Sequence, residues 1–197
     1  RRVATLFGFW KCPKSFKKHG HGACLLEDVF RCVHEAQITT DGLWARSDPS
    51  SDKQKILILF GATQSKPDDV DRALACAAEL QEGFSRLRES HPSLRLGIGV
   101  TTATVFTGFV GNERRREFTA MGDGVNLAAR LAAKAGAGAT LVDATTKEEA
   151  TRYRFRPAGI LTLKNVRKPT AVFRPDGLID LGALESRDDV VEHPRAL

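Results

Sequence analysis

The apolar run at residues 55–60, Lys-Ile-Leu-Ile-Leu-Phe, is the feature that most narrows the folds open to this chain. A run without polar alternation is typical of a strand that is covered on both faces of a sheet. Gly61 ends the run, and Pro67, Asp68 and Asp69 then open a long segment with helical spacing. Proline suits the first turn of a helix, and carboxylates suit its positive end. The sequence therefore predicts a covered sheet and a long helix that follows this strand.

The rest of the chain interleaves short strands and helices without a strict β-α-β order. Helical spacing of apolar residues predicts helices over 23–37 and 125–134, and residues 40–51 are rich in turn residues. This interleaving favours an α+β fold over a doubly wound sheet. The expected strands are 3–10, 55–60, 94–101, 104–110, 117–120, 140–143, 155–163 and 170–173, with a hairpin turn at 111–116.

Composition limits the classes of function. With 197 residues, 42% hydrophobic and 27% charged, we expect one folded domain over residues 1–175 and a polar tail or linker at 176–197. No apolar run approaches the roughly 20 residues of a membrane helix. The four cysteines form no Cys-x-x-Cys pair, which fits a reducing compartment such as the cytoplasm. The excess of 30 Lys and Arg over 24 Asp and Glu invites nucleic-acid binding, but no recognisable motif or aromatic stacking platform supports such a partner.

The segment from Phe118 to Leu131 carries the clearest chemistry. Asn126 and Arg130 are four residues apart on an expected helix, so they project from one face a turn apart. A neutral amide and a permanent cation held in this way can orient a hydroxyl and stabilise charge that develops on a phosphoryl group. By spacing alone, however, a surface arginine and a helix-start asparagine are the simpler interpretation.

A resemblance to a known family changes this interpretation. Residues 115–130, Arg-Arg-Glu-Phe-Thr-Ala-Met-Gly-Asp-Gly-Val-Asn-Leu-Ala-Ala-Arg, resemble the RR(D/E)(F/Y)TxxGDxVNLAAR signature of class III nucleotidyl cyclases. The likeness extends upstream through residues 98–100 and 107–111 and covers roughly residues 50–175. It implies a ferredoxin-like α+β core, in which a central, mostly antiparallel sheet is flanked by helices. It also implies head-to-tail dimers that bind nucleotide in the seam between two subunits.

The resemblance implies roles for three residues at the sugar and the phosphates. Asn126 is similar to the family residue that positions the ribose. Arg130 is similar to the transition-state arginine at the α-phosphate. Lys164 falls at the lysine that holds the terminal phosphates.

The resemblance also implies which residues contact the base. Thr119 falls where the family reads the base edge, and Met121, two residues further along the motif, joins it as a substrate-binding candidate. Lys53 is the best match to the adenine-binding lysine. Its spacing to Gly61 is one residue shorter than in relatives, which leaves Lys55 as an alternative.

Two departures from the family pattern concern the metal ions. A complete subunit carries one aspartate on its first strand and another before the central strand, and these hold Mg²⁺ or Mn²⁺ for the phosphoryl chemistry. Here Phe9 stands near the first position and Gln54 at the second. We therefore expect this chain to hold no metal and to be inactive alone, with the metal ions held by a partner domain.

This asymmetry is similar to that of the second, C2-like catalytic half of a two-domain cyclase. The nearest resemblance is to the second catalytic domain of soluble, bicarbonate-responsive adenylyl cyclases. It implies conversion of ATP to cyclic AMP and pyrophosphate together with a metal-bearing C1-like domain, expected in the same polypeptide. One alternative is an inactive cyclase-homology domain that only dimerises and regulates. Another is a guanylyl cyclase, which Thr119 and the lysine disfavour because guanine recognition usually uses a cysteine and a glutamate there.

Overall fold

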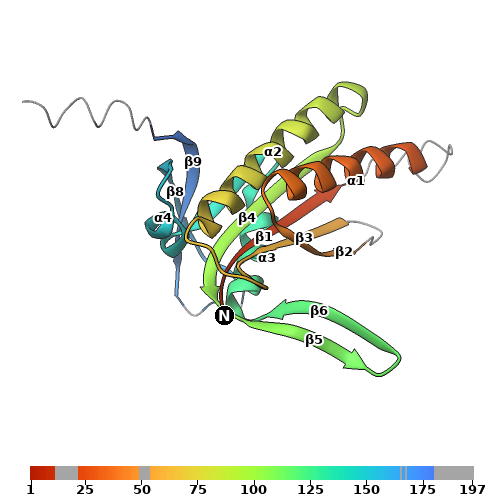
Figure 1. Ribbon diagram of the computed structural model, residues 1–197. Helices are drawn as coiled ribbons and strands as arrows, with labels where there is room; N and C mark the ends of the chain where they lie inside the picture. The colour runs from red at the N-terminus through yellow and green to blue at the C-terminus, as the bar shows by residue number, and fades with distance from the viewer. Residues whose placement is uncertain (12–21, 49–53, 165, 167, 180–197) are drawn as a thin grey trace, which may run out of the picture.

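A seven-stranded sheet forms the centre of the computed structural model, which describes residues 1–11, 22–48, 54–164, 166 and 168–179 (Figure 1). Its strands lie in the order β2-β3-β1-β4-β7-β9-β8 and are antiparallel to their neighbours, except that β4 and β7 are parallel. The predicted α+β class with a mostly antiparallel sheet is therefore confirmed. The strands of this sheet are β1 (Arg2–Lys11), β2 (Leu43–Asp48), β3 (Gln54–Phe60), β4 (Arg95–Thr104), β7 (Ala139–Asp143), β8 (Tyr153–Leu161) and β9 (Thr170–Leu178).

Two long helices, α1 (Gly22–Thr39) and α2 (Asp69–Ser90), lie side by side over one face of the sheet (Figure 1). Their apolar sides form the largest core cluster together with alternate strand residues such as Ile98 and Val100. Residues 56–60 of β3 are all buried, some beneath these helices and some on the opposite face. The prediction that this apolar run is covered on both faces is confirmed.

The third helix, α3 (Asp123–Ala135), packs on the other face against β1 and β4. Side chains alternate along a strand, so β4 turns Ile98 toward α1 and α2 and Gly99 toward α3. A Cβ atom on Gly99 would lie only 2.2 Å from the carbonyl oxygen of Ala128. Glycine is therefore required where the helix crosses this strand, and the close approach holds α3 firmly against the sheet.

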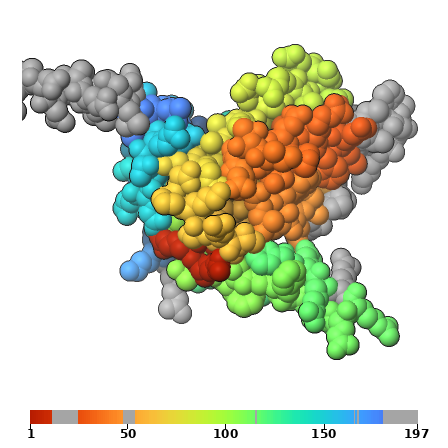
Figure 2. Space-filling view, viewed as in Figure 1, coloured from red at the N-terminus to blue at the C-terminus, as the bar shows by residue number. Residues whose placement is uncertain are grey.

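Strands β5 (Phe106–Asn112) and β6 (Arg115–Met121) form a separate hairpin that projects from the rest of the domain (Figures 1 and 2). Phe118 and Ala120 anchor it, because they pack in a cluster with apolar residues of β1 and β3. Half of the exposed large hydrophobic side chains in the described residues lie on this hairpin. They are Phe106, Phe109, Val110 and Met121.

Two short elements differ from the sequence prediction. Thr40, Asp41 and Gly42, the first three residues of the segment predicted as turns, precede a regular strand. The next six residues form the edge strand β2, which pairs with β3. The prediction of turns is therefore wrong for residues 43–48. Helix α4 (Ala144–Glu149) also follows no predicted pattern, and the carboxylate of Asp143 caps it. Six residues are too few for apolar periodicity to identify either element.

The end of the described chain bears on the predicted domain boundary. β9 runs to Leu178, so regular structure continues three residues past residue 175, where the sequence predicts the domain to end. Residues 180–197 of the predicted polar tail lie outside the described residues. None of the described helices combines the length and the hydropathy that a membrane span requires.

Candidate functional site

Helix α3 presents the two candidate catalytic residues. The backbone N–H of Asn126 donates to the carbonyl of Gly122 at 3.2 Å, which closes the first turn. Asn126 is exposed, and Arg130, one turn further on, is half-buried. Ala128 and Leu131 are fully buried between α3 and the sheet. The predicted pair thus lies on one rigidly packed helix, as the spacing indicates.

The candidate residues for the base edge, Thr119 and Met121, lie on β6 just before α3. Phe118 and Ala120 point into the cluster that anchors the hairpin, so Thr119 and Met121 are turned to its outer face. Thr119 is half-buried, whereas Met121 is 48% exposed. Only Gly122 separates Met121 from the helix that carries Asn126.

Lys164 approaches the same helix from another part of the chain. It lies in the connection between β8 and β9 and is itself exposed. The preceding residue, Leu163, is buried in a cluster with Leu127 and Leu131 of α3. These two leucines directly follow Asn126 and Arg130 in sequence, so the connection that carries Lys164 is held against the candidate catalytic helix.

The two candidate lysines for base recognition differ in what the structure describes. Lys53 lies outside the described residues. Lys55 is half-buried in β3, opposite Phe9 of β1. Leu57 and Leu59, which share its face of the strand, pack in the cluster beneath the hairpin. Lys55 therefore lies on the side of the sheet that carries α3 and the hairpin.

The two positions where the sequence predicts missing metal-binding carboxylates lie on the adjacent strands β1 and β3. The register pairs Phe9 with Lys55 and Trp10 with Gln54, so Phe9 and Gln54 are one register position apart and their side chains are directed to opposite faces of the sheet. Neither side chain is a carboxylate, and no group of three His, Cys, Asp or Glu residues in the described chain could hold a metal ion. The residues present do not fit Mg²⁺ or Mn²⁺, because such hard cations prefer carboxylate oxygens.

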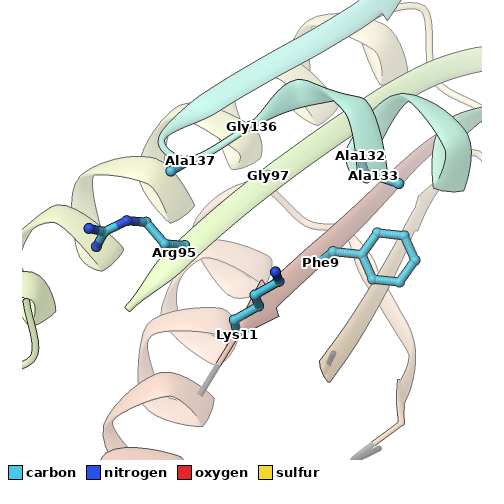
Figure 3. A pocket seen from close by; sticks show the side chains of 8 residues that line it. All are labelled: Phe9, Lys11, Arg95, Gly97, Ala132, Ala133, Gly136 and Ala137. Atoms are coloured by element: carbon cyan, nitrogen blue, oxygen red, sulfur yellow. The ribbon is translucent and has the colours of Figure 1, made fainter. Parts of the chain in front are cut away.

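A pocket of about 290 Å³ opens beside Phe9, between β1, β4 and the C-terminal part of α3 (Figure 3). Lys11 extends along β1 toward Phe9, whereas the guanidinium of Arg95 turns away and donates to the Leu94 carbonyl at 2.8 Å. The lining of the pocket therefore contributes one ammonium group and no carboxylate. A metal cation needs negatively charged ligands, and an ammonium group would repel it. The residues that line it are Phe9, Lys11, Arg95, Gly97, Ala132, Ala133, Gly136 and Ala137.

Residues 54–173, more than half of the chain, match the sequence profile described as the adenylate and guanylate cyclase catalytic domain. The chain belongs to this cyclase family. The resemblance of the Asn126 and Arg130 segment to class III nucleotidyl cyclases is thereby confirmed at the level of the family.

Curated proteins share sequence with parts of this cyclase domain. An uncharacterized protein from Mycobacterium tuberculosis (strain ATCC 25618 / H37Rv) is 36% identical over 129 residues, which are 62% of this chain and 23% of that protein. Adenylate cyclase type 10 from Homo sapiens is 40% identical over 76 residues, which are 38% of this chain and 4% of that protein. The chain therefore spans less than a quarter of the length of these relatives.

Solved structures share the fold over most of the cyclase domain. The guanylyl cyclase Cya2 matches with a TM-score of 0.76 and 25% identity, over 91% of this chain and 94% of that chain. The adenylyl cyclase CyaB from P. aeruginosa matches with a TM-score of 0.74 and 19% identity, over 88% of this chain and 94% of that chain. One fold thus serves both an adenylyl and a guanylyl cyclase, so the fold alone does not select the base.

Sequence motifs did not identify the exposed apolar surface of the hairpin. Along β5, Phe106 and Val110 lie on the outer face and Phe109 on the other, and all three are exposed. Apolar residues occur at both odd and even positions of β5, so both faces of the strand carry them. The same pattern is equally typical of a buried strand. Only the projection of the hairpin beyond the sheet distinguishes the two cases.

Proposed function

We propose that this chain is the C2-like half of an adenylyl cyclase, which converts ATP to cyclic AMP and pyrophosphate at an interface with a metal-bearing C1-like domain. One observation carries the proposal. The candidate transition-state pair Asn126 and Arg130 is present on a well-packed helix, while the neighbouring positions Phe9 and Gln54 carry no carboxylate. This domain has the candidate transition-state residues and lacks the metal-binding carboxylates. It is therefore complementary to a domain that supplies the carboxylates.

The roles of the residues at the reacting groups follow from their chemistry. The ribose 3′-hydroxyl loses its proton to solvent, and its oxygen forms a bond to the α-phosphorus while the bond from that phosphorus to the leaving pyrophosphate breaks. Asn126 would orient the ribose, and the guanidinium of Arg130 would neutralise charge that develops on the α-phosphate. Lys164 would hold the terminal phosphates as pyrophosphate departs. Mg²⁺ or Mn²⁺, held by carboxylates of the partner domain, would supply further charge stabilisation.

Recognition of the base is assigned to the outer face of the hairpin and the start of β3. The hydroxyl of Thr119 can both donate and accept a hydrogen bond, which suits the edge of adenine. Met121 would pack against the base from the same face of β6. Lys53 or Lys55 would complete the contact to the base.

The exposed apolar side chains of the hairpin are evidence for the proposed partner domain. An exposed apolar patch on an otherwise polar surface is typical of a protein interface. Phe106, Val110 and Met121 lie on the same face of the hairpin as Thr119, so a partner that covered the patch would also cover the proposed base-binding residue. Binding of the partner domain would then also complete the nucleotide site.

The proposal is tested by reconstitution. The purified chain is mixed with a class III cyclase domain that carries both metal-binding aspartates, together with ATP and Mg²⁺, and cyclic AMP is measured. We expect product only from the mixture. Arg130→Ala should lower kcat by about 100-fold or more, since one preorganised donor typically contributes about 2.7–4 kcal/mol to transition-state stabilisation. Arg86→Ala is the matched control, because Arg86 is exposed on α2 and pairs with Glu82.

Two outcomes would overturn the proposal. Equal cyclic AMP yields from wild type and Arg130→Ala would remove the assigned role of the arginine. A mixture that forms a stable complex but binds no nucleotide would identify an inactive regulatory domain instead. A competition between ATP and GTP in the same mixture decides whether adenine or guanine is the base.

A further inference from the structure

An ion pair joins the edge strand β2 to the hairpin. The Nε and Nη2 atoms of Arg46 both donate to Oε1 of Glu117, at 3.1 and 2.9 Å. The hairpin strands β5 and β6 pair with each other and form a sheet of their own, separate from the seven-stranded sheet. The ion pair is therefore a directional polar contact between two sheets.

A β-bulge turns Arg46 toward the hairpin. The register of β2 with β3 shifts between Trp44 and Arg46, so Ala45 is the extra residue. Ala45 packs in the cluster beneath the hairpin, and Arg46 is the register partner of Leu57, which belongs to the same cluster. Two successive residues thus face one side of the sheet, whereas simple alternation would direct Arg46 to the side of α1.

Glu117 lies two residues before Thr119, the candidate residue for the base edge. Both side chains project from the same face of β6, because residues two apart on a strand share a face. Phe118 and Ala120, on the other face, anchor the strand by apolar packing. Apolar burial has no preferred direction, whereas hydrogen bonds from a guanidinium to a carboxylate depend on geometry. The ion pair therefore restrains the orientation of the segment that carries Thr119.

Arg46 also lies beside the lysine that is the alternative base contact. Because Arg46 pairs with Leu57 in register, Lys55 is its diagonal neighbour on the same face of β3. Such neighbours are about 7–8 Å apart. Lys55 belongs to the large sheet and Thr119 to the hairpin, so the two candidate base contacts come from different elements. The Arg46 ion pair connects those two elements next to both residues.

The ion pair is too exposed to contribute much to folding. The side chains of Arg46 and Glu117 are 50% and 39% exposed. Ion pairs at such exposure add little to stability, because water screens their charges. Loss of the pair should therefore leave the chain folded, so an effect on nucleotide binding can be separated from unfolding. Arg46 also precedes residue 54, where the match to the cyclase family begins, so the family assignment gives it no role.

We propose that Arg46 is a positioning residue for recognition of the nucleotide base. Through Glu117 it holds Thr119 in the orientation that meets the edge of the base. In this role Arg46 contacts no substrate atom and acts only through the strand that it restrains. The role depends on the proposed function, because it is a part in the binding of ATP.

The mixture of the full chain with a metal-bearing cyclase domain tests the proposal. Arg46→Gln and, separately, Glu117→Gln should raise the KM for ATP by about three- to fivefold, the factor that loss of one exposed ion pair can produce, and should change kcat by less than about twofold. The ratio of kcat/KM for ATP to that for GTP should fall by a similar factor, because the two nucleotides differ only in the base. Arg86→Gln is the matched control, since Arg86 forms an exposed ion pair with Glu82 on α2, and it should behave like wild type.

A double variant and a second measurement separate positioning from other roles. Arg46→Gln combined with Glu117→Gln should raise the KM no further than either single change, because both remove the same ion pair. Arg46→Lys, which keeps the positive charge, should raise it less than Arg46→Gln. In the isolated chain, hydrogen exchange of the backbone amides of residues 117–121 should be faster in Arg46→Gln than in Arg86→Gln. Equal thermal unfolding midpoints establish that the variants are folded.

Four results would overturn the proposal. The same KM for Arg46→Gln and Arg86→Gln would remove the assigned role, and additive effects of the two glutamine changes would show that Arg46 and Glu117 act separately. A loss of affinity for the partner domain by the same factor, measured by analytical ultracentrifugation, would assign the ion pair to that interface instead. Absence of cyclic AMP from the wild-type mixture would contradict the proposed function and this role with it, whereas cyclic AMP formed with an unaltered KM would contradict this role alone.

Discussion

Phe9 and Lys55 are register partners across β1 and β3, so an aromatic ring and an ammonium group occupy adjacent positions where a complete cyclase subunit would begin its metal site. The ring of Phe9 also packs against Phe7, with 5.0 Å between the ring centroids. The position where the sequence predicts a missing metal ligand is thus part of an aromatic contact beside a cation.

A single reversion at this position should not restore metal binding. In Phe9→Asp the new carboxylate would lie opposite Lys55, and a cross-strand ion pair would form instead of a metal ligand. We expect no Mn²⁺ binding by electron paramagnetic resonance, and a loss of about 2–4 kcal/mol in the free energy of unfolding from the lost ring. Phe9→Leu, which keeps an apolar side chain, is the control. Stoichiometric Mn²⁺ binding by Phe9→Asp would contradict this account of the pocket.

The hairpin should contribute to association and not to folding. Phe106 and Val110 are 56% and 43% exposed on its outer face. Phe106→Ser with Val110→Ser should change the free energy of unfolding by less than about 0.5 kcal/mol, because exposed side chains add little to stability. The same variant should weaken binding to a metal-bearing cyclase domain by about tenfold or more, measured by analytical ultracentrifugation. Ile160→Ser, at a 72% exposed position on β8, should weaken it far less.

The crossing of α3 over β4 should be intolerant of any side chain. Gly99→Ala would force a Cβ atom to within 2.2 Å of the Ala128 carbonyl oxygen, which only a backbone shift can relieve. We expect a loss of about 3 kcal/mol in urea unfolding. Gly8→Ala on the adjacent strand is the matched control. Its nearest neighbour would be the Leu96 side chain at 3.4 Å, and the expected cost is below about 1 kcal/mol. Similar costs at the two glycines would disprove this reading of the packing.

The two described thiols should make stability fall in alkaline solution. Burial raises the pKa of Cys32 to about 11 and the pKa of Cys76 to about 12, from 9.0 for an ordinary thiol. Folding therefore favours the protonated thiols. Their contribution is fully present below pH 9.0 and is lost as the pH rises through 11 to 12, because the unfolded thiols ionise first. Unfolding by urea between pH 8 and pH 11 should show a shallower decline for Cys32→Ala with Cys76→Ala than for wild type. Parallel curves would contradict the assignment to these thiols.

Much of the fold could be predicted because its signals are local. The apolar run at 55–60 identifies a covered strand, and the helical spacing around Leu131 identifies α3. The edge strand β2 escaped prediction because its second half, Arg46 to Asp48, is polar and its pairing with β3 is a long-range event. The β-propensity of these residues does not predict the strand, because the strand depends on backbone hydrogen bonds to β3.

The candidate site was predictable only in part, for a similar reason. Asn126 and Arg130 share a helix, so their spacing in sequence predicts their spacing in space. The link from Lys164 to that helix depends on burial of Leu163 against Leu131, two residues far apart in sequence.

The connection between the hairpin and α3 has a mechanical consequence. β6 ends at Met121 and α3 begins at Asp123, so Gly122 alone joins an arm that projects from the domain to the helix that carries Asn126. Phe118 and Ala120 hold the base of this arm against β1 and β3. A displacement that disturbed this packing would therefore reach the first turn of α3 through a connection of one residue.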